Sequence, residues 1–433
     1  MSAAGWSAQL TAEGPGGFAG PMRQATLPPR LRPDAELAVL DITEWFGETS
    51  GGIRTYLLEK AKYVAARPTL RHTLVVPGHR DRVTDADGVR LCRLRGPRIP
   101  GQKPYRFMFA TRSIAHLLRH EHADIIEIGS PFLVPWMVRH ATRSSAVPMV
   151  CFYHTNLPRQ FAPAADTGGL VQRALRDATW RYMRRLDALV PLTIVASAYS
   201  ARELARVGID RVAQVPLGVD LAAFTPARRA DADATRARLG LPAGPLAAFV
   251  GRFAREKELE TVLDGWAEVE RRCGARLALV GAGPMEATLR AHPYGHRVHF
   301  VPFVQDRATL ADLLAALDVY VAAGPIETFG LSAIEALASG TPVLTVSEGA
   351  VVERVEASGA GRVFQRGEPT SLADEAVTLF GEDLAALGAR GRAYAVAEHG
   401  WETVFDRLFT VYRSVLRREV PPVLRSARPA GVR

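Results

Sequence analysis

Short apolar runs alternate with longer segments of helical periodicity along most of the chain. In the first half, runs typical of buried strands cover residues 37–41, 72–77, 125–129, 147–153 and 188–195. Helical periodicity lies between them, most clearly over residues 52–66 and 198–207. Strands that alternate with helices are typical of βαβ units, which place their strands in a parallel sheet.

A second alternating series follows a short link with proline and glycine at residues 214–220. Its predicted strands cover residues 246–251, 276–281, 298–302, 318–322 and 342–346, and its predicted helices cover 259–273, 308–317 and 331–338. The pattern therefore predicts an α/β protein of two doubly wound, Rossmann-like domains. Because such sheets bind ligands at the carboxyl ends of their strands, we expect the domains to face a central cleft.

Changes in composition set the expected boundaries. Residues 1–33 are rich in Gly, Ala and Pro and have no steady apolar period, which predicts a disordered tail. An N-terminal domain is expected over residues 34–213 and a C-terminal domain over 214–398. A late amphipathic helix falls within residues 399–420, and residues 421–433 are expected to be a flexible tail.

The composition is that of a globular protein and argues against several classes. The 433 residues carry a formal net charge of only +9, with no zinc-ligand spacing and no aromatic–basic pattern, so no nucleic-acid partner is expected. Cys92, Cys151 and Cys273 are odd in number and far apart, which argues against a disulfide framework. No apolar run has transmembrane length and no signal peptide is evident, so the expected location is the cytoplasm.

The segment 325–335 combines two carboxylates with a predicted helix start. Glu327 and Glu335 lie on either side of Phe329-Gly330-Leu331, where the helix begins. Unpaired N–H groups and the helix dipole make such a start an anion site. Carboxylates beside an anion site favour a ligand with both phosphates and hydroxyls, such as a nucleotide sugar. Glu335 has apolar neighbours, and a buried unpaired carboxylate is costly, so a ligand partner is favoured there.

Two basic residues follow an earlier buried strand. Arg252 and Lys257 lie just after the predicted strand 246–251 and could both reach a diphosphate. Alone they would be read as a solvated loop, and the acidic pair after a second strand end favours the functional interpretation. The turn Gly281-Ala-Gly283 lacks the third glycine of a dinucleotide fingerprint, so we interpret it as a turn that a nucleotide approaches.

Three strand-end features mark the first half of the chain. Gly51 and Gly52 precede a predicted helix and allow close backbone approach to a ligand, although a plain tight turn is an even alternative. His154 follows the strand 147–153 and could hydrogen-bond a substrate hydroxyl or donate to a transferred group, whereas a lone histidine is more often structural. Ser130-Pro131 is a similar loop that would line the acceptor side.

Together these residues resemble glycosyltransferase family 4, retaining enzymes of GT-B fold. The motif Gly251-Arg252…Glu256-Lys257 and the pair Glu327 and Glu335 carry the resemblance, which spans residues 36–420. The element around His154 is similar to the branch of bacterial mannosyltransferases and sulfoquinovosyltransferases that glycosylate lipids. The Gly-x-Pro-Glu pattern common after residue 349 is missing, and Val351-Val-Glu353 stands there.

The resemblance implies roles for the matching positions. Arg252 and Lys257 would bind the donor diphosphate, Glu327 and His154 would contact the transferred sugar, and Glu335 would bind the ribose. The backbone of Phe329, Gly330 and Leu331 would hold sugar and phosphates, and Gly52 would pass close to the diphosphate. Residues 34–213 would be the acceptor domain, 214–398 the donor domain, and the late helix would cross back onto the first domain. No cofactor or metal would be required.

These observations predict a retaining transferase that moves a hexose from GDP-mannose or a UDP-glucose type of donor to a hydroxyl of a lipid or saccharide. Two alternatives stay open, a GT-B nucleotide-sugar hydrolase or epimerase and a non-catalytic nucleotide-sugar-binding protein. Glu327 could be a nucleophile or a clamp on the sugar hydroxyls. Peripheral binding to an anionic membrane is a further hypothesis, based on bases and apolar residues over 103–119, where an ordinary core stripe is the alternative.

Overall fold

The computed structural model describes residues 21–47, 52–100, 105–143, 145, 147–161 and 169–419 of the chain. Its internal contacts divide these residues into two compact units. Unit 1 takes in the described residues up to Ala196, Ser200–Val215 and those from Phe405 onward. Unit 2 consists of Ser197–Tyr199 and Pro216–Val404. The expected boundary between residues 213 and 214 therefore lies two residues from the observed one.

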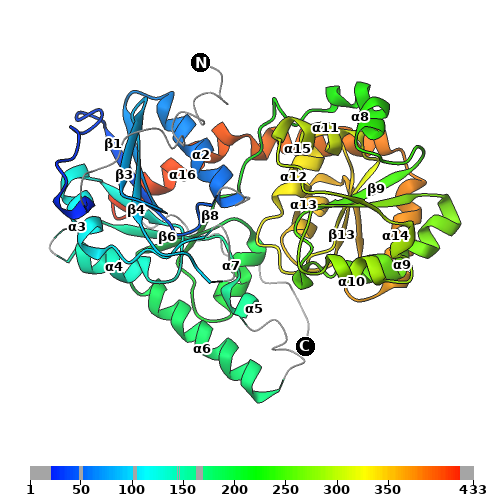
Figure 1. Cartoon of the computed structure of the whole chain (residues 1–433), viewed down its shortest axis with the longest axis horizontal. Helices are drawn as coiled ribbons and strands as arrows, with labels where there is room; N and C mark the ends of the chain where they lie inside the picture. Colours follow the sequence, from blue (N-terminus) through cyan, green and yellow to red (C-terminus); the bar gives the residue numbers. More distant parts are fainter. Residues whose placement is uncertain are drawn as a thin grey trace. The chain divides into compact units, whose positions relative to one another are not determined.

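Unit 1 is built on a sheet of eight strands among the described residues, in the order β3-β4-β2-β1-β5-β6-β7-β8 (Figure 1). All neighbouring pairs are parallel except β3 and β4, which form a hairpin. The strands are β1 (Leu37–Ile42), β2 (Leu70–Gly78), β3 (Arg82–Ala86), β4 (Val89–Arg95), β5 (Ile125–Ile128), β6 (Met149–Tyr153), β7 (Leu192–Val195) and β8 (Val212–Gln214).

Helices of unit 1 follow these strands along the chain. They are the short η1 (Met22–Gln24), α2 (Gly52–Ala65), α3 (Thr111–Glu121), α4 (Val134–Ala141), α5 (Leu157–Phe161), α6 (Leu170–Asp187) and α7 (Ala198–Ala205). The last helix of the chain, α16 (Trp401–Leu416), begins in unit 2 and continues in unit 1. There its aromatic residues Phe405 and Phe409 pack against Tyr63 of α2, with ring centroids 5.4 and 5.2 Å apart.

Unit 2 contains a second sheet, of six described strands that all run parallel in the order β11-β10-β9-β12-β13-β14. They are β9 (Leu246–Val250), β10 (Arg276–Val280), β11 (His299–Val301), β12 (Val319–Ala322), β13 (Val343–Val346) and β14 (Gly361–Phe364). The helices are η2 (Pro226–Asp231), α8 (Ala232–Arg238), η3 (Arg255–Lys257), α9 (Leu259–Cys273), α10 (Glu286–Ala291), η4 (Gly295–Arg297), α11 (Arg307–Ala316), α12 (Leu331–Ala338), α13 (Val351–Ser358), α14 (Pro369–Phe380) and α15 (Leu384–His399).

The core of unit 2 shows why its strands read as continuous apolar runs. The inner strands of this parallel sheet are the most deeply buried: β12 and β13 along their whole length, and β9 and β10 at all but one residue. The edge strands β11 and β14 are only partly buried. Trp266 of α9 is fully buried, and its indole N–H donates to the carbonyl of Ala275 at 3.0 Å. Sequence periodicity consequently located α9 and α12 at their observed bounds.

The structure corrects two expectations for unit 1. Residues 21–33 are not disordered, because Met22 is buried and Arg32 donates to the backbone carbonyls of Val64, Arg67 and Leu70. The remainder of the expected tail, residues 1–20, lies outside the described residues, as does the tail from 420 onward. The hairpin of β3 and β4 was not expected from the sequence, because its turn Asp87-Gly88 was not recognised.

Within the segment 103–119, only residues 111–119 are helical among the described residues, as part of α3. Met108, Ile114 and Leu117 are all buried in the core of unit 1. Its apolar side is therefore not available as a membrane surface, although Phe109 is exposed. No helix in the described part of the chain is both long and apolar enough to cross a bilayer.

Candidate functional site

Two neighbouring strands of unit 2 bring the predicted site residues together. Strands β9 and β12 are adjacent and parallel, with Tyr320 in register with Ala248. Their carboxyl ends therefore lie at the same edge of the sheet, where α/β proteins bind ligands. The loop after β9 leads to Lys257, and the loop after β12 carries Glu327.

A pocket of about 280 Å³ opens at this edge. Five of the predicted residues line it: Arg252, Lys257, Glu327, Gly330 and Leu331. Tyr320 and Val351 line it as well and were not predicted from the sequence. The loops after β9 and β12 are far apart in the sequence, but they lie close together in space because the two strands pair in parallel.

Lys257 and Glu327 form an ion pair inside the pocket. Both side chains stay partly open to solvent, at 20% and 31% exposure, so the pair can exchange partners with a ligand. A side chain at Gly324 would meet Lys257 Cδ at 3.2 Å and Glu327 Cγ at 3.5 Å. Glycine at this position therefore lets the two charged side chains approach each other.

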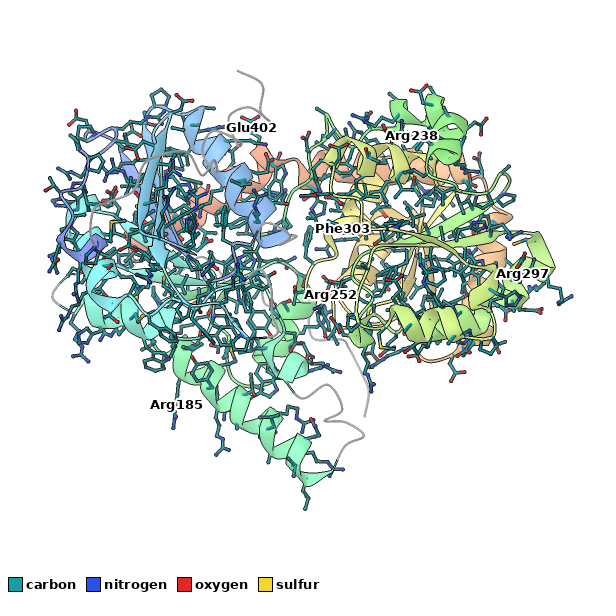
Figure 2. All side chains as sticks on the ribbon, in the orientation of Figure 1. Arg185, Arg238, Arg252, Arg297, Phe303 and Glu402 are labelled. Atoms are coloured by element: carbon teal, nitrogen blue, oxygen red, sulfur yellow. The ribbon has the colours of Figure 1, made fainter. Side chains whose placement is uncertain are left out.

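Arg252 supplies a second cation at the rim of the pocket. Its guanidinium donates to Glu256 at 2.6 Å, and its side chain is mostly exposed (Figure 2). Exposed pairs of this kind contribute little to stability and rearrange easily. Arg252 is therefore free to turn toward an anionic ligand in the pocket.

The start of α12 forms one wall of the pocket. Gly330 precedes the helix with φ of +81°, a conformation that favours glycine. A Cβ there would lie 2.3 Å from Cγ2 of Val351, so this position excludes any side chain. The N–H groups of the first turn of a helix favour anions, and Lys257 at the same pocket adds a positive charge.

Phe329 lies behind the pocket and does not line it. Its ring is buried against the guanidinium of Arg354, 4.0 Å away, and near the ring of His399 at 5.7 Å. Arg354 is itself buried, and burial lowers its pKa to about 10. Only the backbone of Phe329 is thus available to contact a ligand, while its buried side chain holds the loop in place.

Glu335 is placed differently from the expectation that a ligand would pair with it. It does not line the pocket, and its buried carboxylate accepts from Arg307 Nη1 at 2.8 Å. Burial raises the pKa of Glu335, and the charge of Arg307 opposes that rise. A buried carboxylate needs a partner, and here that partner is Arg307 of α11. The sequence did not reveal it because Arg307 lies 28 residues away in the chain.

The glycines after β10 serve the packing of the site loop. A Cβ on Gly281 would lie 2.0 Å from the carbonyl oxygen of Gly251, and one on Gly283 would lie 2.3 Å from that of Phe253. These glycines therefore let the turn after β10 press against the loop after β9. The structure gives them this packing role in addition to the ligand approach that the sequence suggested.

In unit 1, His154 lines a small apolar cavity of about 40 Å³. Its ring stacks on Phe152 at 4.1 Å and meets Tyr56 edge-on at 5.4 Å. Burial, together with the charge of Lys60, lowers the pKa of His154 to about 3. The imidazole is therefore neutral at physiological pH, where it can hydrogen-bond a hydroxyl but cannot act as an imidazolium acid.

The other predicted residues of unit 1 are placed as follows. Gly52 is the first residue of α2, as expected, and Gly51 lies outside the described residues. Ser130 and Pro131 line the same cavity as His154.

A buried charge cluster in unit 1 was not predicted at all. Lys60 of α2 donates to Asp41 at 2.8 Å and lies 3.4 Å from Glu127, and the hydroxyl of Tyr412 on α16 hydrogen-bonds both Lys60 and Glu127. Asp41 and Glu127 are paired in register on β1 and β5. The one signal in the sequence was the rarity of lysine, of which the chain has four.

Comparisons with known proteins identify the family of the chain. Residues 50–223 match the family described as Glycosyltransferase Family 4, and residues 244–382 match Glycosyl transferases group 1. A GDP-mannose-dependent alpha-(1-6)-phosphatidylinositol dimannoside mannosyltransferase of Mycobacterium tuberculosis is 31% identical over 82% of this chain and 92% of its own length. A sulfoquinovosyl transferase of Arabidopsis thaliana is 30% identical over 60% of this chain and 49% of its own.

Solved structures share the fold at low identity. Sucrose-phosphate synthase from Thermosynechococcus elongatus has a TM-score of 0.71 at 22% identity, covering 88% of this chain and all of that one. HepE of Anabaena, in complex with UDP-glucose, has a TM-score of 0.67 at 17% identity, with coverage of 88% and 100%. The two parallel-sheet α/β units are those of a GT-B glycosyltransferase, and the chain belongs to glycosyltransferase family 4.

Proposed function

We propose that this glycosyltransferase transfers mannose from GDP-mannose, with retention of configuration, to a hydroxyl of a lipid acceptor. The observation that supports it most is the pocket where Lys257, Arg252 and the start of α12 converge beside Glu327. The mannosyltransferase from Mycobacterium tuberculosis, which is named for a GDP-mannose donor and a phosphatidylinositol acceptor, favours this donor and acceptor class.

The pocket has the charges that a nucleoside diphosphate leaving group needs. Lys257 and Arg252 would neutralise the charge that develops on the diphosphate, and the N–H groups at the start of α12 would add hydrogen bonds. Two cations and a helix start can together replace a metal ion in this task. We therefore propose that transfer needs no metal, so a chelator such as EDTA should leave the rate unchanged.

Glu327 is better suited to hold sugar hydroxyls than to attack the sugar. Its carboxylate is already paired with Lys257, and the pairing lowers the electron density available to a nucleophile. A carboxylate accepts hydrogen bonds from two hydroxyls at once. We propose that Glu327 clamps the sugar and that Glu335, reached once Arg307 turns aside, takes the ribose.

A binding and transfer experiment tests the proposal. A ligand that binds only the folded protein raises its melting temperature, so GDP-mannose, GDP-glucose, UDP-glucose and UDP-galactose can be compared in one thermal-shift panel. Radiolabelled donor is then incubated with phosphatidylinositol and with free myo-inositol. GDP-mannose should stabilise most and label should enter the lipid; a shift with UDP-sugars alone would contradict the donor assignment.

Donor alone separates the remaining alternatives. Rapid release of free mannose without acceptor would indicate a hydrolase. A melting shift without turnover of any acceptor would indicate a binding protein. Retention of configuration is read from the anomeric proton of the product by NMR.

A further inference from the structure

The first half of α6 is exposed on nearly every side. Leu170 and Val171 are 83% and 80% exposed, and Leu175 is 42% exposed. Figure 1 shows α6 extending away from the sheet of unit 1. Three large apolar side chains within six residues of one helix are unusual on a surface exposed to water.

These residues continue the buried stripe of the same helix. Val171, Leu175, Thr179 and Met183 follow at intervals of four, and Leu186 comes three residues later, so they share one face. Thr179, Met183 and Leu186 are buried. Met183 and Leu186 line the cavity that contains His154. One apolar face of α6 thus runs from this cavity to the exposed end of the helix.

Aromatic residues extend the exposed surface onto α4. Trp136 is 40% exposed, and its indole N–H donates to the hydroxyl of Tyr182 on α6 at 3.3 Å. That hydroxyl lies 2.8 Å from the carbonyl oxygen of Pro131 and 2.6 Å from that of Phe132, either of which can accept its proton. Pro131 lines the cavity as well, so the two helices and the cavity wall form one connected structure.

The charge around this surface is strongly positive. Helix α6 carries Arg173, Arg176, Arg181, Arg184 and Arg185 against only two aspartates, and it has no glutamate. Figure 2 shows Arg185 directed away from the helix. Arginines beside an apolar stripe are typical of helices that lie in the interface of anionic membranes, where the bases meet headgroups and the apolar residues meet acyl chains.

We propose that α6, together with Leu133 and Trp136 of α4, docks on an anionic lipid bilayer. Only the role of this docking, which is to reach a lipid acceptor, rests on the proposed function. Tryptophan at the edge of the surface fits the level of the headgroups. Docking by this face would hold unit 1 at the bilayer surface, where a lipid acceptor keeps its acyl part in the membrane.

Vesicle co-sedimentation tests the surface. The full chain is mixed with vesicles of phosphatidylglycerol and phosphatidylcholine, and separately with phosphatidylcholine alone. We compare wild type with L170S/V171S/L175S and with R173Q/R181Q/R185Q, all of which change exposed side chains. The matched control V396S/R271Q makes the same kinds of change at exposed positions on α15 and α9 of unit 2.

Wild type and control should sediment with the anionic vesicles, and both α6 variants should lose about tenfold or more of their partition coefficient. The arginine variant should also lose the salt dependence of binding. Equal sedimentation of the α6 variants and wild type, or no binding by wild type, would overturn the inference. So would a wild-type dimer in ultracentrifugation that L170S/V171S/L175S converts to monomer, since a second copy would then occupy the surface.

The melting shift with GDP-mannose is measured on the same samples. An α6 variant that keeps this shift but loses vesicle binding supports the surface independently of the donor assignment. If no variant and no wild-type sample responds to any nucleotide sugar, the proposed function fails while the vesicle result still decides the surface.

Discussion

Both units place a lysine beside carboxylates near the carboxyl ends of parallel strands, but they treat the group in opposite ways. In unit 2, Lys257 and Glu327 lie at the wall of an open pocket and remain partly exposed. In unit 1, Lys60, Asp41 and Glu127 are completely buried. The same chemical groups thus line an open pocket in one unit and form a buried cluster in the other, and access to water makes the difference.

The closing element in unit 1 comes from the far end of the chain. Tyr412 of α16 covers the cluster and hydrogen-bonds both Lys60 and Glu127. Asp41 and Glu127 are register partners, so Lys60 faces two adjacent carboxylates, and the buried ring of His72 hydrogen-bonds Asp41 at 2.5 Å. A buried charge of this kind is costly when it loses its partner, so the cluster ties α16 to α2, β1 and β5.

The largest expected effect comes from breaking the buried anchor. Replacing Lys60 by Met removes the lysine cation from two buried carboxylates, while Asp41 keeps its hydrogen bond to His72, and should lower the free energy of unfolding by about 3–5 kcal/mol. Urea denaturation followed by circular dichroism measures it. Lys62→Met is the matched control on the same helix, since Lys62 is partly exposed and pairs with Glu59, and it should cost less than about 1 kcal/mol. Equal losses in both variants would show that the cluster is not an anchor.

Breaking the partly exposed pair of Lys257 and Glu327 should lower activity and leave stability nearly unchanged. Lys257→Ala should lower kcat by about 100-fold or more, because removal of one group that stabilises developing charge has that magnitude. The melting temperature should change little, since Lys257 is partly exposed. Glu327→Ala should behave alike, and Arg255→Ala, an exposed change in the same short helix, should keep full activity. Full activity in the Lys257 variant would remove it from the site.

The pH dependence of stability sharpens the comparison. Burial, aided by the charge of Asp41, raises the pKa of Glu127 to about 7, from an ordinary 4.5, while Lys60 opposes the rise. The folded state therefore binds more protons than the unfolded state between these values, and stability present below pH 4.5 is lost as the pH rises through 7.

Glu127→Gln should remove this loss, which is about 3 kcal/mol at most. Gln keeps an acceptor for the hydroxyls of Tyr56 and Tyr412. Unfolding free energies of the variant and wild type are compared from pH 5 to 8. Parallel curves would show that Glu127 does not titrate in this range.

The smallest effect is expected at the partner of Glu335. Arg307→Ala removes the cation that opposes the raised pKa of Glu335, so the carboxylate should protonate more readily. If Glu335 binds the ribose, the donor KM should rise about tenfold or less, with kcat nearly unchanged, and should recover as the pH is raised. Arg307→Lys should restore part of the affinity. Arg238→Ala, which breaks an exposed pair with Asp312, is the control. A change in kcat alone in the Arg307 variant would contradict a role of Glu335 in binding the donor.

Much of the pocket in unit 2 was predictable because its residues follow strand ends. The apolar runs that became β9 and β12 located Arg252, Lys257 and Glu327 at the correct edge of the sheet. Glu335 was expected to be buried, and it is, but its ion pair with Arg307 was not expected. Periodicity indicates which residues are buried in the core. Which side chain pairs with Glu335 depends instead on how α11 packs against α12.

Unit 1 was less predictable for the same reason. The hairpin of β3 and β4 and the long helix α6 were not expected, and the membrane hypothesis was placed on α3, whose apolar face is in the core. Sequence alone does not distinguish an apolar stripe that is covered from one that continues into solvent. Only the structure shows that the side chains of Val171 and Leu175 are exposed.

The alternation of strands and helices, the two α/β units and the charged residues at the strand ends of the unit 2 pocket all follow from the sequence. Local periodicity and motif spacing are properties of short segments, so they can be read without knowing how the segments pack. The tertiary structure alone decided that Lys60 is an anchor and Lys257 a pocket residue, because burial is a property of everything that packs around a side chain. Tyr412, joined to Lys60 across 352 residues of chain, is the clearest example.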